Sequence, residues 1–124
     1  TNTQGFDLST TTASGSVAFK RAINTISNPD EIDINLLAIP GVIHGLHSTV
    51  TNHAISKMEA RADAFYIMDA AGWSDTIETV KNTIINLDTN YAAVYFPWVQ
   101  VVDSSTDSPS MGSPINCITR CLQL

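Results

Sequence analysis

Short apolar runs alternate with helical patterns along the middle of the chain. Residues 36–39, 64–68 and 91–96 are continuous apolar runs bounded by turn-forming residues, which is typical of strands buried on both faces of a parallel sheet. Apolar positions recur at helical spacing between these runs, over residues 48–61 and 74–84. The order β-α-β-α-β with right-handed crossovers predicts an α/β fold with a small parallel or mixed sheet flanked by helices.

A further helix is predicted before the first strand. It begins at Ser16 and ends before Pro29, and its apolar face carries Phe19, Ala22, Ile23 and Ile26. After the third strand, residues 98–102 either continue that strand beyond Pro97 or form a bent edge strand.

The helix ends and faces can also be assigned from the sequence. The helix over residues 48–61 has Ser48 as its predicted N-cap, and Lys57 and Arg61 are placed on its solvent side. The helix over residues 74–84 has Ser74 as its predicted N-cap. Its predicted buried face consists of Ile77, Val80 and Ile84.

Composition divides the chain into three segments. Residues 1–15 are rich in Thr, Ser, Gly and Asn, which predicts a flexible arm or loop. Residues 16–103 carry the periodic pattern and form the predicted core domain. Residues 104–124 lose the pattern, which predicts an irregular C-terminal tail.

Length and charge exclude several classes of protein. The 124 residues suffice for about one domain. The net charge is −6, of which −5 arises from residues 63–124, so a nucleic-acid partner is not expected. No apolar run approaches the roughly 20 residues of a membrane span, so membrane insertion is not expected either.

The loop after the first strand was tested as a phosphate or metal site. Its glycines, Gly41 and Gly45, are one residue too close for a P-loop, and no Lys follows them. The three histidines lie within ten residues. However, His53 is six residues past His47, which places it on another helix face from His44 and His47.

Asp69 ends the second strand, where open α/β sheets place ligands. It could form an acid–base pair with His44 or His47, but no nucleophile elbow accompanies them. Cys117 and Cys121 are spaced as C-x-x-x-C, unlike a redox C-x-x-C. We therefore predict no catalytic, cofactor-binding or metal-binding residue. The alternative is a small α/β enzyme or nucleotide-binding domain that uses the loop from His44 to Thr49 together with Asp69.

The aromatic residues could be read as a base-stacking platform. Such a platform needs an electropositive groove, and the chain has only six Lys and Arg residues. Burial in the core is therefore predicted for Tyr66, Tyr91, Tyr95 and Trp98.

Three segments resemble the tail sheath protein of contractile-tailed bacteriophages. They are DINLLAIPGV at residues 33–42, EARADAFYIMD at residues 59–69 and NYAAVYFPWVQV at residues 90–101. The resemblance covers roughly residues 15–103. Family members are several times longer and continue past the last strand with a loop unlike residues 104–124, so the chain is expected to be a core fragment.

The resemblance implies a structural function. Copies of a sheath protein pack helically around a tail tube and rearrange on contraction, which drives the tube through the host envelope. The expected partners are neighbouring sheath subunits, the tube protein, and the baseplate and tail terminator; the expected location is the virion tail, after assembly in the host cytoplasm. The resemblance also implies that sheath subunits interlock through terminal arms that add strands to neighbours. The chain is expected to lack these arms, so the fragment is expected to be able to remain monomeric.

Overall fold

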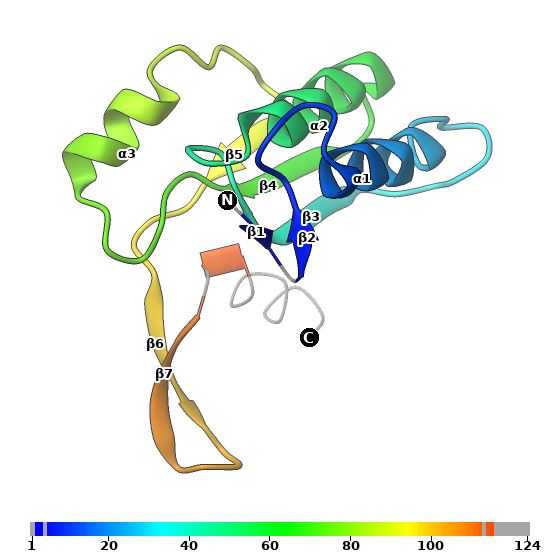
Figure 1. Cartoon of the computed structure of the whole chain (residues 1–124). Helices are drawn as coiled ribbons and strands as arrows, with labels where there is room; N and C mark the ends of the chain where they lie inside the picture. The colour runs from blue at the N-terminus through cyan, green and yellow to red at the C-terminus, as the bar shows by residue number, and fades with distance from the viewer. Residues whose placement is uncertain (1, 4, 113, 116–124) are drawn as a thin grey trace.

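The computed structural model is an α/β fold built on a three-stranded parallel sheet (Figure 1). The structure describes residues 2–3, 5–112 and 114–115. The sheet has the order β3-β4-β5, and parallel pairs join each neighbour. Its strands alternate with helices as the sequence predicts: β3 (Leu36–Ile43), α2 (Ser48–Arg61), β4 (Phe65–Asp69), α3 (Ile77–Ile84) and β5 (Ala92–Val94).

The main core lies between the sheet and two helices. The helix α1 (Ser14–Thr25) lies beside α2 on one face of the sheet (Figure 1). Buried residues from both helices meet those on the facing side of β4, and they include Ile23, Val50, Met58, Tyr66 and Met68. A smaller cluster of Ala70, Ala71 and Val80 attaches α3 to the end of β4.

Only the central strand is buried on both faces. All four residues from Tyr66 to Asp69 are buried, and β4 is the strand with a neighbour on each side. The prediction of fully buried strands is wrong for β3 and β5, which form the sheet edges. Leu36 is exposed, and the three residues of β5 are half-buried.

The first strand is longer than predicted because it contains an irregularity. It does not end before Pro40 but continues to Ile43, and three extra residues separate the Ala38–Ile67 pair from the Ile43–Asp69 pair. Gly41 lies within this stretch at φ 85°, a conformation that glycine adopts without strain. After the irregularity, β3 pairs with β4 again, through Ile43 and Asp69 at the carboxyl end of β4.

Two helix starts differ from the predictions. Residue 47, not Ser48, is the N-cap of α2, and its side chain makes no capping hydrogen bond. The N-cap of α3 is Thr76, whose hydroxyl accepts from the Thr79 N–H, instead of Ser74. Ile77 is the first residue of α3 and is exposed, whereas Val80 is buried and Ile84 half-buried.

Arg61 is buried, which contradicts its predicted place on the solvent side of α2. Its guanidinium donates to the Ile26 and Ile32 carbonyl oxygens at 2.7 and 2.5 Å, and it forms an ion pair with Asp63 at 2.6 Å. The connection from α1 to β3 therefore folds back over the end of α2. Lys57 is half-buried.

The segment predicted to be a flexible arm contains two short strands. The strands β1 (Asn2–Thr3) and β2 (Phe6–Asp7) pair in antiparallel fashion, and Leu8 joins the main core. The helix α1 begins at Ser14, two residues before the predicted start. Packing against α1 thus orders the described residues of this segment, which composition alone did not indicate.

A β ribbon occupies part of the segment predicted to be irregular. The strands β6 (Val99–Asp103) and β7 (Ser108–Gly112) pair in antiparallel fashion over five residue pairs. Residues 98–102 therefore neither continue β5 nor join its sheet. Figure 1 shows the ribbon extending away from the α/β layers.

Within the described residues, no helix is long and apolar enough to cross a membrane.

Candidate functional site

The loop after β3 and the end of β4 meet at the carboxyl edge of the sheet. The His44 N–H donates to the Asp69 carbonyl oxygen at 2.8 Å, and the Gly45 N–H donates to the Ala70 carbonyl oxygen at 3.0 Å. The side chains of His44, His47 and Asp69 are all buried there. The structure therefore brings together the residues that the sequence placed at this edge.

The His44 ring links the sheet edge to α2. Its Nδ1 lies 2.7 Å from the Thr51 hydroxyl, which is fully buried on the first turn of the helix. Burial lowers the pKa of His44, so the neutral imidazole predominates at pH 7. A neutral imidazole beside a hydroxyl could act as a base, but burial of both groups keeps the pair from solvent and favours a structural role.

The His47 ring closes the turn between β3 and α2. Its Nδ1 accepts the Ile43 N–H at 3.1 Å, so this nitrogen carries no proton. The two rings therefore both stabilise the turn, His47 through the backbone of β3 and His44 through α2. Neither bond was visible in the sequence, because both depend on how the turn folds.

His53 lies apart from the other two histidines, as its helical position predicts. Its Nε2 is 2.8 Å from the Asn24 side-chain oxygen on α1. Burial, together with the charges of Lys57 and Lys20, lowers the pKa of His53. Among the described residues, no three His, Cys, Asp or Glu side chains are grouped to hold a metal ion; Cys117 and Cys121 lie outside those residues.

The aromatic residues divide between core and surface. Tyr66 is fully buried, Tyr91 is half-buried, and Tyr95 is exposed, so the prediction of burial is wrong for Tyr95. Trp98 is half-buried and donates its indole N–H to the Ala71 carbonyl oxygen at 2.9 Å. This bond ties the start of the ribbon to the turn after β4.

Tyr66 carries a buried hydroxyl that makes no hydrogen bond within the described part of the chain. Burial, and secondarily the charge of Asp69, raise the pKa of Tyr66 far above its ordinary value. The unfolded chain releases this proton near pH 10, whereas the folded chain retains it. The stability of the fold is therefore expected to fall as the pH rises above about 10.

We expect Tyr66→Phe to remove this alkaline loss. The substitution deletes a buried hydroxyl without a partner, so it should raise the free energy of unfolding by about 1 kcal/mol at pH 7, and by more at pH 11. Urea denaturation at both pH values measures the difference. A variant less stable than wild type at pH 7 would mean that the hydroxyl has a partner.

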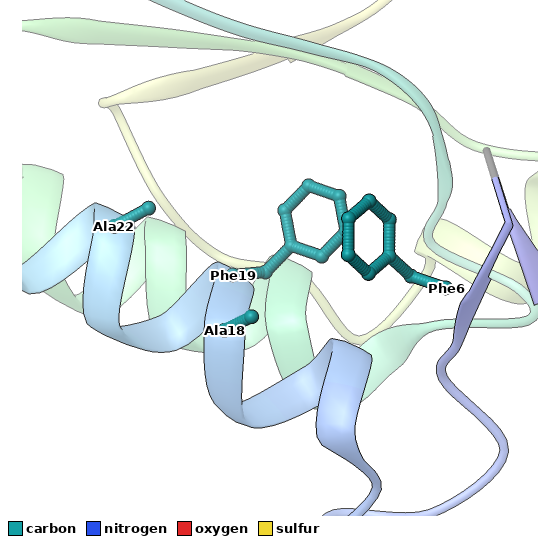
Figure 2. A pocket seen from close by; sticks show the side chains of 4 residues that line it. All are labelled: Phe6, Ala18, Phe19 and Ala22. Atoms are coloured by element: carbon teal, nitrogen blue, oxygen red, sulfur yellow. The ribbon is translucent and has the colours of Figure 1, made fainter.

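Two apolar hollows occur away from the histidines. One, of about 260 Å³, is lined by Phe6, Ala18, Phe19 and Ala22, and Figure 2 shows the two phenylalanine rings at its wall. These rings meet edge to face, with centroids 6.1 Å apart. The other, also about 260 Å³, is lined by Met68, Ile84, Leu87, Thr89, Ala92 and Val94. Neither gathers the polar groups that orient a small-molecule ligand.

The surface near α3 presents large apolar side chains to solvent. Trp73, Ile77 and Ile85 are 68, 75 and 65% exposed. Ile77 is the first residue of α3 and Ile85 directly follows its last residue, whereas Trp73 lies in the turn before the helix. This surface was not predicted from the sequence, because the helical spacing assigned Ile77 to the buried face together with Val80 and Ile84.

The chain was compared with family models, curated proteins and solved structures. None of them matches it, so the likeness to tail sheath proteins rests on its three sequence segments.

Proposed function

We propose that the chain is the core of a subunit of a contractile phage tail sheath, and that its function is mechanical. The three segments that resemble the sheath family contribute to one continuous body: residues 33–42 include most of β3, residues 59–69 include β4, and residues 90–101 include β5. A sheath subunit needs such a body, because contraction moves subunits as nearly rigid units while contacts between neighbours change.

The apolar surface near α3 is the observation that carries the proposal. We name the residues Trp73, Ile77 and Ile85 the α3 patch. Scattered exposed apolar residues are ordinary, but three large exposed side chains on and beside one short helix favour contact with another protein. In the assembled tail, the α3 patch would be covered by a neighbouring subunit.

The expected partners follow from this function. They are neighbouring sheath subunits, the tube protein, and the baseplate and terminator at the two ends of the tail. The net charge of −6 would favour basic surfaces on these partners. The protein would act in the virion after assembly in the host cytoplasm.

The test is assembly of the complete open reading frame that encodes this chain. Negative-stain electron microscopy and sedimentation velocity should detect tubes or rings of the wild-type product. The double variant Ile77→Lys and Ile85→Lys should reduce the assembled fraction at least tenfold, because it places two charges in a buried contact. The folding of the variant is checked by its urea denaturation curve.

A matched control introduces a lysine at another exposed helical position. Asn52 is exposed on α2, so Asn52→Lys should assemble as wild type does. A wild-type product that remains monomeric, or a double variant that assembles normally, would contradict the proposal.

A further inference from the structure

The β6–β7 ribbon lacks the support that two-stranded sheets usually need. Within the described part of the chain, its strands pair only with each other. An isolated two-stranded ribbon is at best marginally stable in water. Nevertheless it presents Val101, Val102 and Met111 to solvent, at 37, 63 and 46% exposure. A further strand paired to one edge would stabilise it.

The two edges of the ribbon differ in their ability to accept a strand. Pro109 lies opposite Val102 in β7 and has no N–H. Proline is tolerated in a sheet where the missing N–H would face away from the partner strand, so the outer edge of β7 lacks a donor at this position. Proline at an edge is also a device that prevents strand addition. The edge of β7 is therefore protected.

Among the described residues, the outer edge of β6 carries no proline and pairs with no other strand. Because the Val102–Pro109 pair is one whose backbone groups face away from each other, Val102 turns its N–H and carbonyl outward. Gln100, two residues earlier, does the same. Two outward donors and two outward acceptors therefore lie along one open edge.

This edge is complementary to a second copy of itself. If two β6 strands run antiparallel with Val101 opposite its counterpart, each Gln100 pairs with the Val102 of the second copy and all four outward groups at each strand are used. Each Asp103 then lies opposite Val99 of the second copy, so no two acidic positions are opposed. Shifting the register by two residues leaves part of these groups unpaired.

We propose that the outer edge of β6 is a self-association surface, on which a second copy of the chain adds its own β6 to form the four-stranded sheet β7-β6-β6-β7. The contact is symmetric, so it closes as a dimer. Gln100, Val102, Pro109 and Met111 share one face of the ribbon, and the dimer joins two such faces into one surface. The proposal is independent of the sheath function, which depends on the α3 patch.

The first test blocks the edge without changing the pairing within the ribbon. Val102→Pro removes an outward N–H and adds a ring at the edge, whereas Val102→Thr retains the N–H and a β-branched side chain. In sedimentation equilibrium over a concentration series, wild type and Val102→Thr should dimerise. The dissociation constant should rise at least about tenfold in Val102→Pro, because the symmetric contact loses two hydrogen bonds.

The second test measures the register. In a Cys117→Ser and Cys121→Ser background, Val101→Cys places two thiols opposite each other across a non-hydrogen-bonded pair, where side chains are closest. Mild oxidation should then yield a covalent dimer. Gln100→Cys is the matched control and should yield far less, because its two thiols are displaced along the strands.

Several results would overturn the proposal. The wild-type chain could stay monomeric throughout the concentration series, or its dimer could persist in Val102→Pro. The two cysteine variants could also cross-link to the same extent. A dimer that is lost in the Ile77→Lys and Ile85→Lys variant but not in Val102→Pro would assign association to the α3 patch instead.

Discussion

Replacing Arg61 with methionine is expected to lower the free energy of unfolding by about 3 kcal/mol. The Arg61 side chain is fully buried, and its guanidinium donates to two backbone carbonyl oxygens, those of Ile26 and Ile32. Methionine retains much of the side-chain volume but donates no hydrogen bond, so both carbonyl groups lose their donor. Urea denaturation followed by far-UV circular dichroism measures the loss.

Most of this effect should come from the carbonyl groups and not from the ion pair. Asp63 has a side chain that is 44% exposed, so water can hydrate its carboxylate when Arg61 is removed. Asp63→Asn should therefore cost less than about 1 kcal/mol. If Asp63→Asn were as destabilising as Arg61→Met, the ion pair would be the dominant interaction and this explanation would be wrong.

Lys57 provides the matched control on the same helix. It lies one turn before Arg61 and is half-buried. Lys57→Met removes the same charge from the same helix without removing a donor to the connection between α1 and β3. It should change the free energy of unfolding by less than about 0.5 kcal/mol.

The position of Arg61 also marks the limit of prediction from the sequence. Apolar spacing gave the bounds of α2 correctly, because a buried stripe is a local property of the chain. The same spacing placed Arg61 on the solvent side, since it cannot show that residues 26–32 return to cover that side. Burial of a charged residue at a helix end depends on contacts between distant segments.

The candidate site shows the same division. The meeting of the His44 loop with Asp69 was predictable, because parallel strands bring their carboxyl ends to one edge. The hydrogen bond between Thr51 and His44 was not predictable. The Thr51 hydroxyl reaches the His44 ring only because of the conformation of the turn that His47 closes. The β6–β7 ribbon was missed for another reason: β7 contains Pro109, Gly112 and two serines, a composition that favours loops over strands.

Gly15 provides a direct test of the N-terminal segment. The sequence predicts a flexible arm over residues 1–15, whereas the structure packs β2 against the first turn of α1. A Cβ atom at Gly15 would overlap the Asp7 carbonyl oxygen and lie 2.9 Å from the Phe6 Cβ. Such distances require the backbone of β2 to move, because a carbonyl oxygen has no rotamer to change.

We expect Gly15→Ala to lower the free energy of unfolding by about 2 kcal/mol. Alanine favours a helix over glycine by about 1 kcal/mol, so the displacement of β2 must outweigh this gain. Hydrogen exchange should increase over residues 5–8 at the same time, because β2 and Leu8 would separate from α1 and the core. Ser14→Ala is the control: Ser14 is exposed, so the substitution should change stability by no more than about 0.5 kcal/mol. If Gly15→Ala were as stable as wild type and exchange over residues 5–8 were already fast, the segment would be the arm that its composition indicates, and its packing against α1 would contribute nothing to the fold.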